Sequence, residues 1–492
     1  MSGAEFMQRK STARHGLLIA VSCLALGACS TTAVEMAQPQ VTVPDDWQET
    51  DVAPVSVDLT GYWRLLGDPL LTEYVEQAIV ENRDIAASAA RLDQARASLV
   101  QARAGYLPSV SASGSANRDV GDFSRDGVQF SLGADASWEA DLFGQISGSV
   151  NAAEADLASS GYNLADLQRL IVGQVAVATI NARSTAAQLA IARSTLAIQE
   201  DNLQIARWRN QAGLVSSLDV EQARTQRAQT AASIPRLESS LTATANSIST
   251  LIGEPPGRVL EAILADESGM VPEPPMLAGF SAPAEVLQRR PDVRAAEANL
   301  ASATARIGVA RAQLLPLVRL RGSIGTGPVT AGNLFDIIAG SIIGSVSQLI
   351  FDGGRTRAQV DSAEAGARVA LANWEQAILQ ALADVETAAV DQRTADDRVA
   401  FNQEGLEAAT NTAILARSQY QAGLIDFQVL LTAENALLSA QNQLITSEAD
   451  RAIAFVRLTQ ALGGGWTAAD FDNPSVADAT STATGASDRT AQ

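Results

Sequence analysis

One 25-residue stretch occurs twice in this chain of 492 residues. Residues 84–108 and 292–316 align without a gap at an offset of 208, and 11 of their 25 positions are identical. The correspondence continues at an offset of 210, where the QAGL sequence at 211–214 matches the QAGL sequence at 421–424. Solenoid repeats are far shorter, at about 20–50 residues. The chain therefore contains two copies of one large unit, and these copies must pack side by side.

Each copy has the same predicted order of parts: a helix, two strand-like segments joined by a turn, a long helix, a QAGL turn and a return helix. A connector joins the copies, and a tail rich in Ser, Thr, Ala and Asp is predicted to be disordered. The predicted boundaries are 57–256 for the first copy (β-hairpin about 108–143, coiled-coil tip about 211–217), 257–282 for the connector, 283–463 for the second copy (β-hairpin about 316–351, tip about 421–427) and 464–492 for the tail.

The start of the chain has the form of a secretory signal. Arg9, Lys10 and Arg14 precede the apolar run GLLIAVSCLALGA, which is typical of a signal peptide. The run ends in LGAC, which resembles the processing site of bacterial lipoproteins. The resemblance implies a signal peptide at residues 1–28, a lipidated N-terminal Cys29 and a tether at 29–56. Ser30 after this cysteine implies sorting to the outer membrane; the alternative is an ordinary signal with a chance cysteine.

Composition argues against an enzyme. The only Lys, the only His and one of the two Cys lie in the signal, at Lys10, His15 and Cys23. The mature chain would lack the usual residues for general-base, Schiff-base, thiol and zinc chemistry, so we expect no cofactor and no metal site. Its 32 basic and 54 acidic residues give a net charge of −22. Such a surface is a poor partner for nucleic acid.

Residues 128–139 alternate strictly between apolar and polar side chains, which is typical of a strand with two different faces. Such a strand belongs either to a soluble sheet or to a transmembrane barrel, apolar toward lipid and polar toward a lumen. The signal and a second hairpin favour the barrel. In that hairpin, 317–327 places Arg319 and Arg321 on one face. The apolar segment 334–351 contains Asp336 and recurring Gly and Ser, which indicates a loop and a strand rather than a membrane helix.

The long helices are predicted to run through water. Residues 147–211 contain no convincing helix breaker, and a helix of about 65 residues spans roughly 95 Å. The hydrocarbon core of a membrane is only about 30 Å thick. The return helix is predicted to continue to residue 251, with a kink at Pro235.

Several motifs resemble those of one family: GYWRLLGDPLL, SWEADLFG, RRPDVRAAEANLASATARIGVARAQLLP, LIFDGGR and the paired QAGL turns. In this order they resemble the TolC/OprM/NodT family of outer-membrane efflux channels over nearly the whole mature chain. The resemblance implies a mixed α and β membrane protein: a homotrimer whose 12-stranded outer-membrane β-barrel is continuous with a periplasmic α-helical barrel. Periodicity alone leaves the copy number open, because two chains would give eight strands and three would give twelve.

The resemblance also assigns candidate functional residues around the two QAGL turns. The family's periplasmic adaptor docks near such tips, which makes six residues candidate contacts: Gly213, Leu214, Val215, Gly423, Leu424 and Ile425. The family narrows its tunnel nearby, in some members with acidic rings. Here the candidate gate residues are Asp219, Asp426, Val429 and Thr432. Because Val429 and Thr432 stand where TolC has aspartates, the gate of this chain is expected to be more apolar.

The function implied is a passive exit duct for small molecules such as drugs. The duct would dock to a periplasmic adaptor and, through it, to a proton-driven inner-membrane transporter of the RND type. Metal-ion efflux and type I protein secretion are related alternatives. A periplasmic coiled-coil scaffold lipoprotein without a pore is the alternative from another class, and a periplasmic adaptor is a further one.

Overall fold

The computed structural model describes residues 34–48, 59–118, 120, 128–266, 270–275, 281–327, 331–336 and 338–466. Cys29 and the signal lie outside the described residues. The chain divides into two compact units. The sheet unit contains Arg91–Ser160, Ala295–Gln376 and the described part of Met1–Gln40; the helical unit contains the described parts of Val41–Ala90, Gly161–Arg294 and Ala377–Gln492. No helix within these ranges has the length and apolar character needed to cross a membrane.

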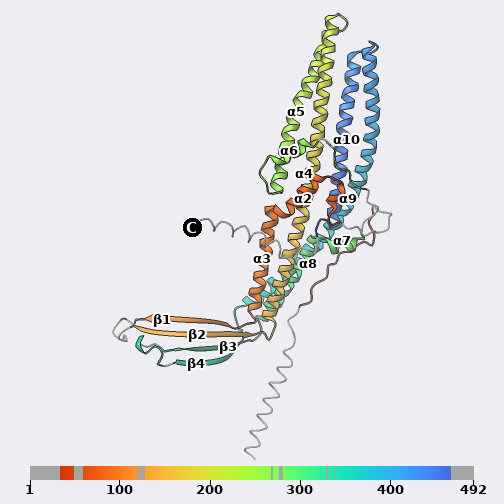
Figure 1. Ribbon diagram of the computed structural model, residues 1–492. Helices are drawn as coiled ribbons and strands as arrows, with labels where there is room; N and C mark the ends of the chain where they lie inside the picture. The colour runs from red at the N-terminus through yellow and green to blue at the C-terminus, as the bar shows by residue number, and fades with distance from the viewer. Residues whose placement is uncertain are drawn as a thin grey trace, which may run out of the picture. The chain divides into compact units, whose positions relative to one another are not determined.

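The sheet unit holds one antiparallel sheet of four strands in the order β1-β2-β3-β4 (Figure 1). The strands are β1 (Ser109–Asn117), β2 (Gln129–Ala140), β3 (Leu317–Thr326) and β4 (Ile338–Ser347). The duplicated strand hairpin is therefore confirmed, with β1 and β2 from the first copy and β3 and β4 from the second. The apolar segment 334–351 contains β4 and not a helix, as its glycines and serines indicated. A short 3₁₀ turn, η2 (Ala331–Asn333), precedes it.

Two helical hairpins of equal size follow the strands. They are α4 (Gln145–Gln211) with α5 (Ser217–Leu251), and α9 (Arg355–Gln421) with α10 (Phe427–Ala461). The helices α4 and α9 have 67 residues each, and α5 and α10 have 35 each. Pro235 lies inside α5, which stays helical on both sides of it. The equal lengths show that both copies kept the same helical hairpin.

Shorter helices complete the two copies. They are η1 (Tyr62–Leu66), α2 (Pro69–Glu81), α3 (Arg83–Ala104), α6 (Arg258–Ala265), α7 (Pro283–Arg289) and α8 (Pro291–Ala312). Asp68 caps α2, because its Oδ1 accepts hydrogen bonds from the backbone N–H groups of Leu70 and Leu71 at 2.9 and 3.2 Å. The same carboxylate accepts bonds from the buried Arg183 of α4 at 3.0 and 3.1 Å. One aspartate thus starts α2 and ties it to a long helix.

Each copy clamps the end of its return helix with a side chain from an equivalent position. In the first copy, Asn82 Nδ2 donates to the carbonyl of Leu251 at 2.8 Å, while its Oδ1 caps α3. In the second copy, Arg290 Nη1 donates to the carbonyl of Ala461 at 3.3 Å. Positions 82 and 290 differ by 208, and 251 and 461 by 210, which are the offsets of the duplication. The clamp is therefore duplicated with a change of side chain.

Of the two clamping side chains, Arg290 also forms ion pairs, whereas Asn82 forms only hydrogen bonds. The Arg290 guanidinium is buried and contacts the carboxylates of Asp292 and Asp384 at 2.6 and 3.0 Å. Burial by itself raises the pKa of Asp292. The hydrogen bond from Arg290 and its positive charge lower this pKa by more than burial raises it, so the pKa lies below its usual value. This contribution to stability is present at neutral pH and is lost as the pH falls through the lowered pKa.

We predict that Arg290→Ala lowers the thermal stability of the protein strongly. The change leaves Asp292 without its partner and frees a helix-end carbonyl. Breaking a fully buried ion pair costs about 3–5 kcal/mol, and the cost here should be smaller because the Asp292 side chain is 29% exposed to water. The midpoint of thermal unfolding, followed by far-ultraviolet circular dichroism, measures the loss. The exposed Arg91→Ala on α3 is the control and should leave the midpoint unchanged. Equal midpoints for both variants would contradict the role of Arg290.

Candidate functional site

One face of the four-stranded sheet is apolar from edge to edge. The strand register assigns side chains to faces, since directly paired residues point to the same side. On this face Thr326 has the only polar side chain among the described residues. The other positions are Val110, Ala112, Gly114 and Ala116 of β1; Phe130, Leu132, Ala134, Ala136, Trp138 and Ala140 of β2; Val318, Leu320, Gly322 and Ile324 of β3; and Ile338, Gly340, Ile342, Gly344 and Val346 of β4.

The opposite face is mostly polar and rich in serine; Leu317, Ala339 and Ile343 are its apolar side chains in the described strands. Its charged residues in the described strands are Asp135, Glu139, Arg319 and Arg321, and Arg319 forms an ion pair with Glu139 at 3.1 Å. Serine hydroxyls meet across the strands in three pairs at 2.8 to 2.9 Å: Ser109 with Ser137, Ser115 with Ser131, and Ser323 with Ser341. The sheet thus separates an apolar surface from a hydroxyl-lined surface, and the charges on the latter balance.

Both edges of this sheet are open. Among the described residues, β1 pairs only with β2, and β4 pairs only with β3. Every residue of these two outer strands is exposed. Their free N–H and C=O groups form a template for further strand pairing, and in lipid each unpaired group would cost several kcal/mol. The sheet is therefore one part of a larger closed structure if it lies in a membrane.

We predict that the two faces respond oppositely to an added charge. Ile342→Arg places a cation on the apolar face, where such a substitution in a membrane barrel costs about 2–4 kcal/mol near the midplane. The neighbouring Ser341→Arg points to the polar face and is the matched control. The folded, heat-modifiable fraction in outer-membrane extracts should fall several-fold for Ile342→Arg alone. Equal loss in both variants would contradict the assignment of faces.

The two helical hairpins end in turns of the same design. Gly213 and Gly423 have φ values of +72° and +73°, which glycine adopts without strain. The next residue closes each turn, because Leu214 N donates to Arg209 O at 2.8 Å and Leu424 N donates to Gln419 O at 2.9 Å. This is the Schellman pattern of helix termination, which explains why both copies keep a glycine at this position.

A compact cluster inside the helical unit holds the two tips together. Its buried members are Leu203, Ala206, Ala223, Ala416, Tyr420, Phe427, Leu430 and Ala433. The rings of Tyr420 and Phe427 meet edge to face at 5.7 Å between centroids. Arg209 of the first hairpin lies over the Tyr420 ring at 4.6 Å and donates to the Tyr420 carbonyl at 3.1 Å. The first hairpin is thus fastened to the second next to both turns.

The sequence did not point to this fastening. The positions equivalent to Tyr420 and Phe427 in the first copy are Asn210 and Ser217. The first turn uses a polar bond instead, from Asn210 Nδ2 to the carbonyl of Val215 at 3.0 Å. The sequence contained one indication of this contact: the two tips otherwise repeat, but Tyr420 and Phe427 are replaced by Asn210 and Ser217 in the first copy. It marks residues that join the two copies rather than residues that form the turn.

The candidate adaptor contacts differ in exposure. Leu214 and Leu424 are 69% and 75% exposed, so each turn presents a leucine to solvent. Val215 and Ile425 are half-buried, and Ile425 packs against the tip cluster. The two glycines shape the turns. Leu214 and Leu424 are therefore the candidate contacts whose side chains are most available.

The candidate gate residues also separate into groups. Val429 is 51% exposed, and the exposed Thr432 donates to the carbonyl of Gln428 at 2.8 Å. Asp219 is half-buried, with Ser216 Oγ at 3.4 Å. Asp426 is exposed at the start of α10 without a side-chain capping bond. Asp219 and Val429 lie in the first turns of α5 and α10, Thr432 lies in the second turn of α10, and Asp426 directly precedes α10.

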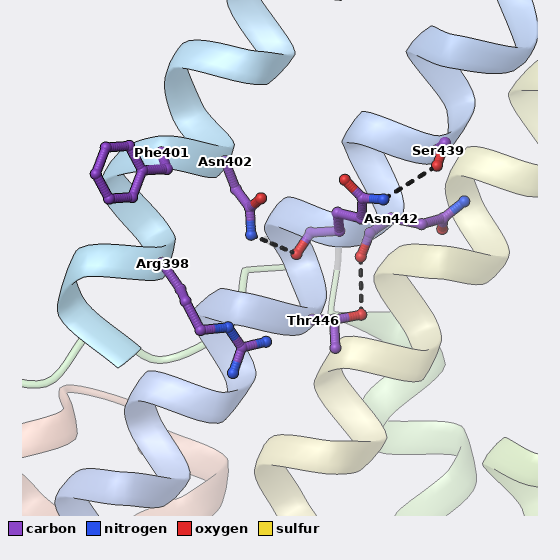
Figure 2. A pocket seen from close by; sticks show the side chains of 7 residues that line it. Arg398, Phe401, Asn402, Ser439, Asn442 and Thr446 are labelled. Carbon is purple, nitrogen blue, oxygen red and sulfur yellow. Dashed lines mark hydrogen bonds between the residues drawn. The ribbon is translucent and has the colours of Figure 1, made fainter. Parts of the chain in front are cut away.

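A groove of about 550 Å³ lies further along the second hairpin. It is lined by Arg398, Phe401 and Asn402 of α9 and by Ser439, Asn442, Gln443 and Thr446 of α10 (Figure 2). Asn402 Nδ2 donates to the Gln443 carbonyl at 3.4 Å, and Arg398 pairs with Asp450 at 2.9 Å. Phe401 points away from α10 in Figure 2 and is 72% exposed. The Phe401 side chain thus lies on the face of α9 that is turned away from α10 and exposed to solvent.

The sequence model of one family, described as outer membrane efflux protein, matches residues 74–254 and 282–464. The two matched ranges follow the two copies of the duplicated unit and together cover well over half of the chain. The chain belongs to the outer membrane efflux protein family. The resemblance read from the motifs is thus confirmed, and this efflux protein is placed in the outer membrane and not among periplasmic scaffolds.

Relatives match this efflux protein over nearly its whole length. The pyoverdine export outer membrane protein OpmQ of Pseudomonas aeruginosa is 31% identical over 458 residues, which cover 90% of this chain and 96% of the relative. Nodulation protein T of Rhizobium leguminosarum bv. trifolii is 30% identical over 450 residues, covering 87% and 93%. Among solved structures, the outer-membrane channel OprN is 31% identical with a TM-score of 0.80, covering 88% of this chain and 99% of that one.

Proposed function

We propose that this efflux protein is a passive exit duct, assembled from three copies of the chain, for small organic molecules. The observation that carries the proposal is the four-stranded sheet with one apolar face, one hydroxyl-lined face and two open edges. Each feature answers a need of a lipid-embedded pore wall. The apolar face meets lipid, the polar face meets water, and the open edges pair with further copies.

Three copies suit a duct better than two. Two sheets of four strands would close into eight strands, and an eight-stranded barrel is largely filled by its own side chains. Three sheets give twelve strands and a wider interior. The serine hydroxyls and the balanced charges of the polar face would then line a wet passage without a strong preference for one sign of charge.

The helical tips supply the partner surface in this proposal. A duct alone does not energise transport, so the free energy must come from an inner-membrane transporter of the proton-driven RND type, reached through a periplasmic adaptor. The exposed Leu214 and Leu424 offer the adaptor one apolar contact on each turn. Cys29 would add a lipid anchor beside the barrel.

Small organic molecules are the favoured cargo class. Relatives named for export of pyoverdine, of antibiotics and of toluene match this chain at 29–31% identity. The relative named for cation efflux, CusC of Escherichia coli, is 28% identical. The polar face offers hydroxyl groups and a paired Arg319–Glu139, which suits cargo that passes without being bound. Export of metal ions and of proteins is the alternative outcome of a cargo assay.

We predict that Leu214→Arg with Leu424→Arg abolishes export while assembly stays intact. Each change places a cation where an apolar contact to the adaptor is expected, and neither side chain belongs to the tip cluster. The measurement is drug susceptibility of cells together with the amount of oligomer in the outer membrane. The control variant, Val80→Arg with Leu264→Arg, alters two exposed apolar residues away from the tips and should export normally. Wild-type resistance in the tip variant would contradict the docking proposal.

A planar bilayer tests the duct itself. We expect purified wild-type protein to give rare, small openings, because Arg209 fastens the first hairpin to Tyr420. Arg209→Ala removes this contact and should raise the open probability at least several-fold. Silence from both well-inserted proteins would contradict the proposed function.

A further inference from the structure

A second groove, of about 790 Å³, lies between α4 and α5, and the end of α10 contributes Arg457 and Gln460 to its lining. All of its lining residues belong to the helical unit. We call it the α4–α5 groove. Its volume falls within the range of roughly 300–1,000 Å³ that is typical of sites for small organic ligands.

The α4–α5 groove lies on the face of α4 that the described chain leaves open. Arg183, which bonds to Asp68 before α2, is buried, and so are the residues four, seven and eleven positions before it. Thr185 and the residues at the same spacing before it line the groove instead, and two of these, Gln174 and Asn181, are exposed. Because two residues turn a helix by about 200°, the two rows lie on opposite faces.

Two reciprocal hydrogen bonds hold α10 at one end of the groove. Gln460 Nε2 donates to the carbonyl of Arg169 at 2.7 Å, and Arg169 Nη1 donates to the carbonyl of Gln460 at 3.2 Å. The Gln460 side chain crosses α4 at Gly173, where a Cβ atom would overlap with its amide. Arg457 precedes Gln460 by three residues and therefore lies on the same side of α10. The glycine and the two bonds thus set the position from which Arg457 reaches the groove.

The groove offers hydrogen-bond donors and one positive charge. Arg457 is its only charged lining residue, and no ion pair joins Arg457 to another described residue. The side chains of Gln174, Asn181, Ser240 and Ser247 also lack a hydrogen-bond partner within the described ranges. A guanidinium presents its N–H groups as a planar fork that matches the oxygens of a carboxylate or phosphate. The polar side of the groove therefore suits an anionic group.

Apolar side chains line the groove beside these polar groups, among them Leu170, Val177 and Leu251. We infer that the α4–α5 groove is a binding site for small organic anions on their way through the duct. Arg457 pairs with the anionic group, and the three apolar side chains contact the hydrocarbon part of the molecule. This inference rests on the proposed function and narrows its cargo to a chemical class.

The second copy carries different charges at the equivalent positions. The residues 210 positions after Gln174 and Asn181 are Asp384 and Asp391 of α9. Asn181 and Asp391 are nearly equal in size, so the main difference between them is the negative charge. A carboxylate repels a nearby anion, whereas a neutral amide can donate a hydrogen bond to it. The first copy therefore has the face of the long helix that is suited to anions.

Binding of 2-naphthoate to the assembled protein in nanodiscs tests the site. Isothermal titration calorimetry measures the affinity, and empty nanodiscs give the baseline. We expect uncharged 2-naphthamide, which has the same rings, to bind at least tenfold more weakly than 2-naphthoate. Arg457→Gln should weaken 2-naphthoate binding at least tenfold, which corresponds to about 1.4 kcal/mol. Arg207→Gln removes an exposed arginine outside the groove and is the control. Equal affinities of the wild type for the acid and the amide, or no binding of either, would overturn the inference.

A second variant tests the site without changing α10. Asn181→Asp places the carboxylate of Asp391 at the equivalent position in the groove, where it repels the anion and competes for Arg457. We expect 2-naphthoate to bind at least several-fold more weakly, while 2-naphthamide binds as before. Asn181→Ser, which removes the amide without adding a charge, is the control and should have the smaller effect. Unchanged 2-naphthoate affinity in Asn181→Asp would contradict the proposed site.

Bilayer recordings separate this inference from the proposed duct. In the more open Arg209→Ala protein, 2-naphthoate should reduce the current, and adding Arg457→Gln should remove this effect. Openings that 2-naphthoate leaves unchanged would overturn the placement of the groove along the passage and leave the duct standing. Binding of 2-naphthoate by a well-inserted protein that gives no openings would contradict the duct and support the site.

Discussion

The hydrogen-bonding demand of strand backbones in lipid is the constraint on which this protein depends. Four strands with one face that is apolar except for Thr326 suit a membrane, but their outer edges present rows of N–H and C=O groups that need partners there. Within the part of the chain that the structure describes, both edges of the sheet are open, because each of the two copies supplies one hairpin. The membrane part of the protein is therefore incomplete by construction, and the need to close the sheet favours assembly from several chains.

The helical part meets a different demand, since long helices in water need their apolar rows covered. The equal lengths of α4 and α9, and of α5 and α10, show that both copies answer it with the same hairpin. The clamps at Asn82 and Arg290 fix the return helices at equivalent places. The side chains that make these clamps nevertheless differ between the copies. The first copy uses the neutral amide of Asn82, whereas the second uses the buried guanidinium of Arg290, whose charge is balanced by Asp292 and Asp384.

The tips combine repeated and unrepeated features. Gly213 and Gly423 repeat because a left-handed residue closes each turn, whatever lies around it. Tyr420, Phe427 and Glu434 have no counterparts of the same chemistry in the first copy. Tyr420 and Glu434 accept hydrogen bonds from Arg209 and Asn202 of the other hairpin, and Phe427 packs on the Tyr420 ring. Residues that differ between duplicated halves therefore mark the places where the halves meet, whereas residues that repeat mark local structure.

The sequence by itself determined the duplication, the strand alternation, the helix lengths and the glycine turns, because each depends on interactions between residues close together in the chain. It also indicated the family and its residence in the outer membrane. Only the tertiary structure decided that the apolar face continues across all four strands, that Arg209 reaches Tyr420, and that Ile425 turns toward the tip cluster while Leu214 and Leu424 face solvent. Those features arise from strand register and from packing between residues about 180 to 230 positions apart, and no local pattern of side chains encodes which of them meet.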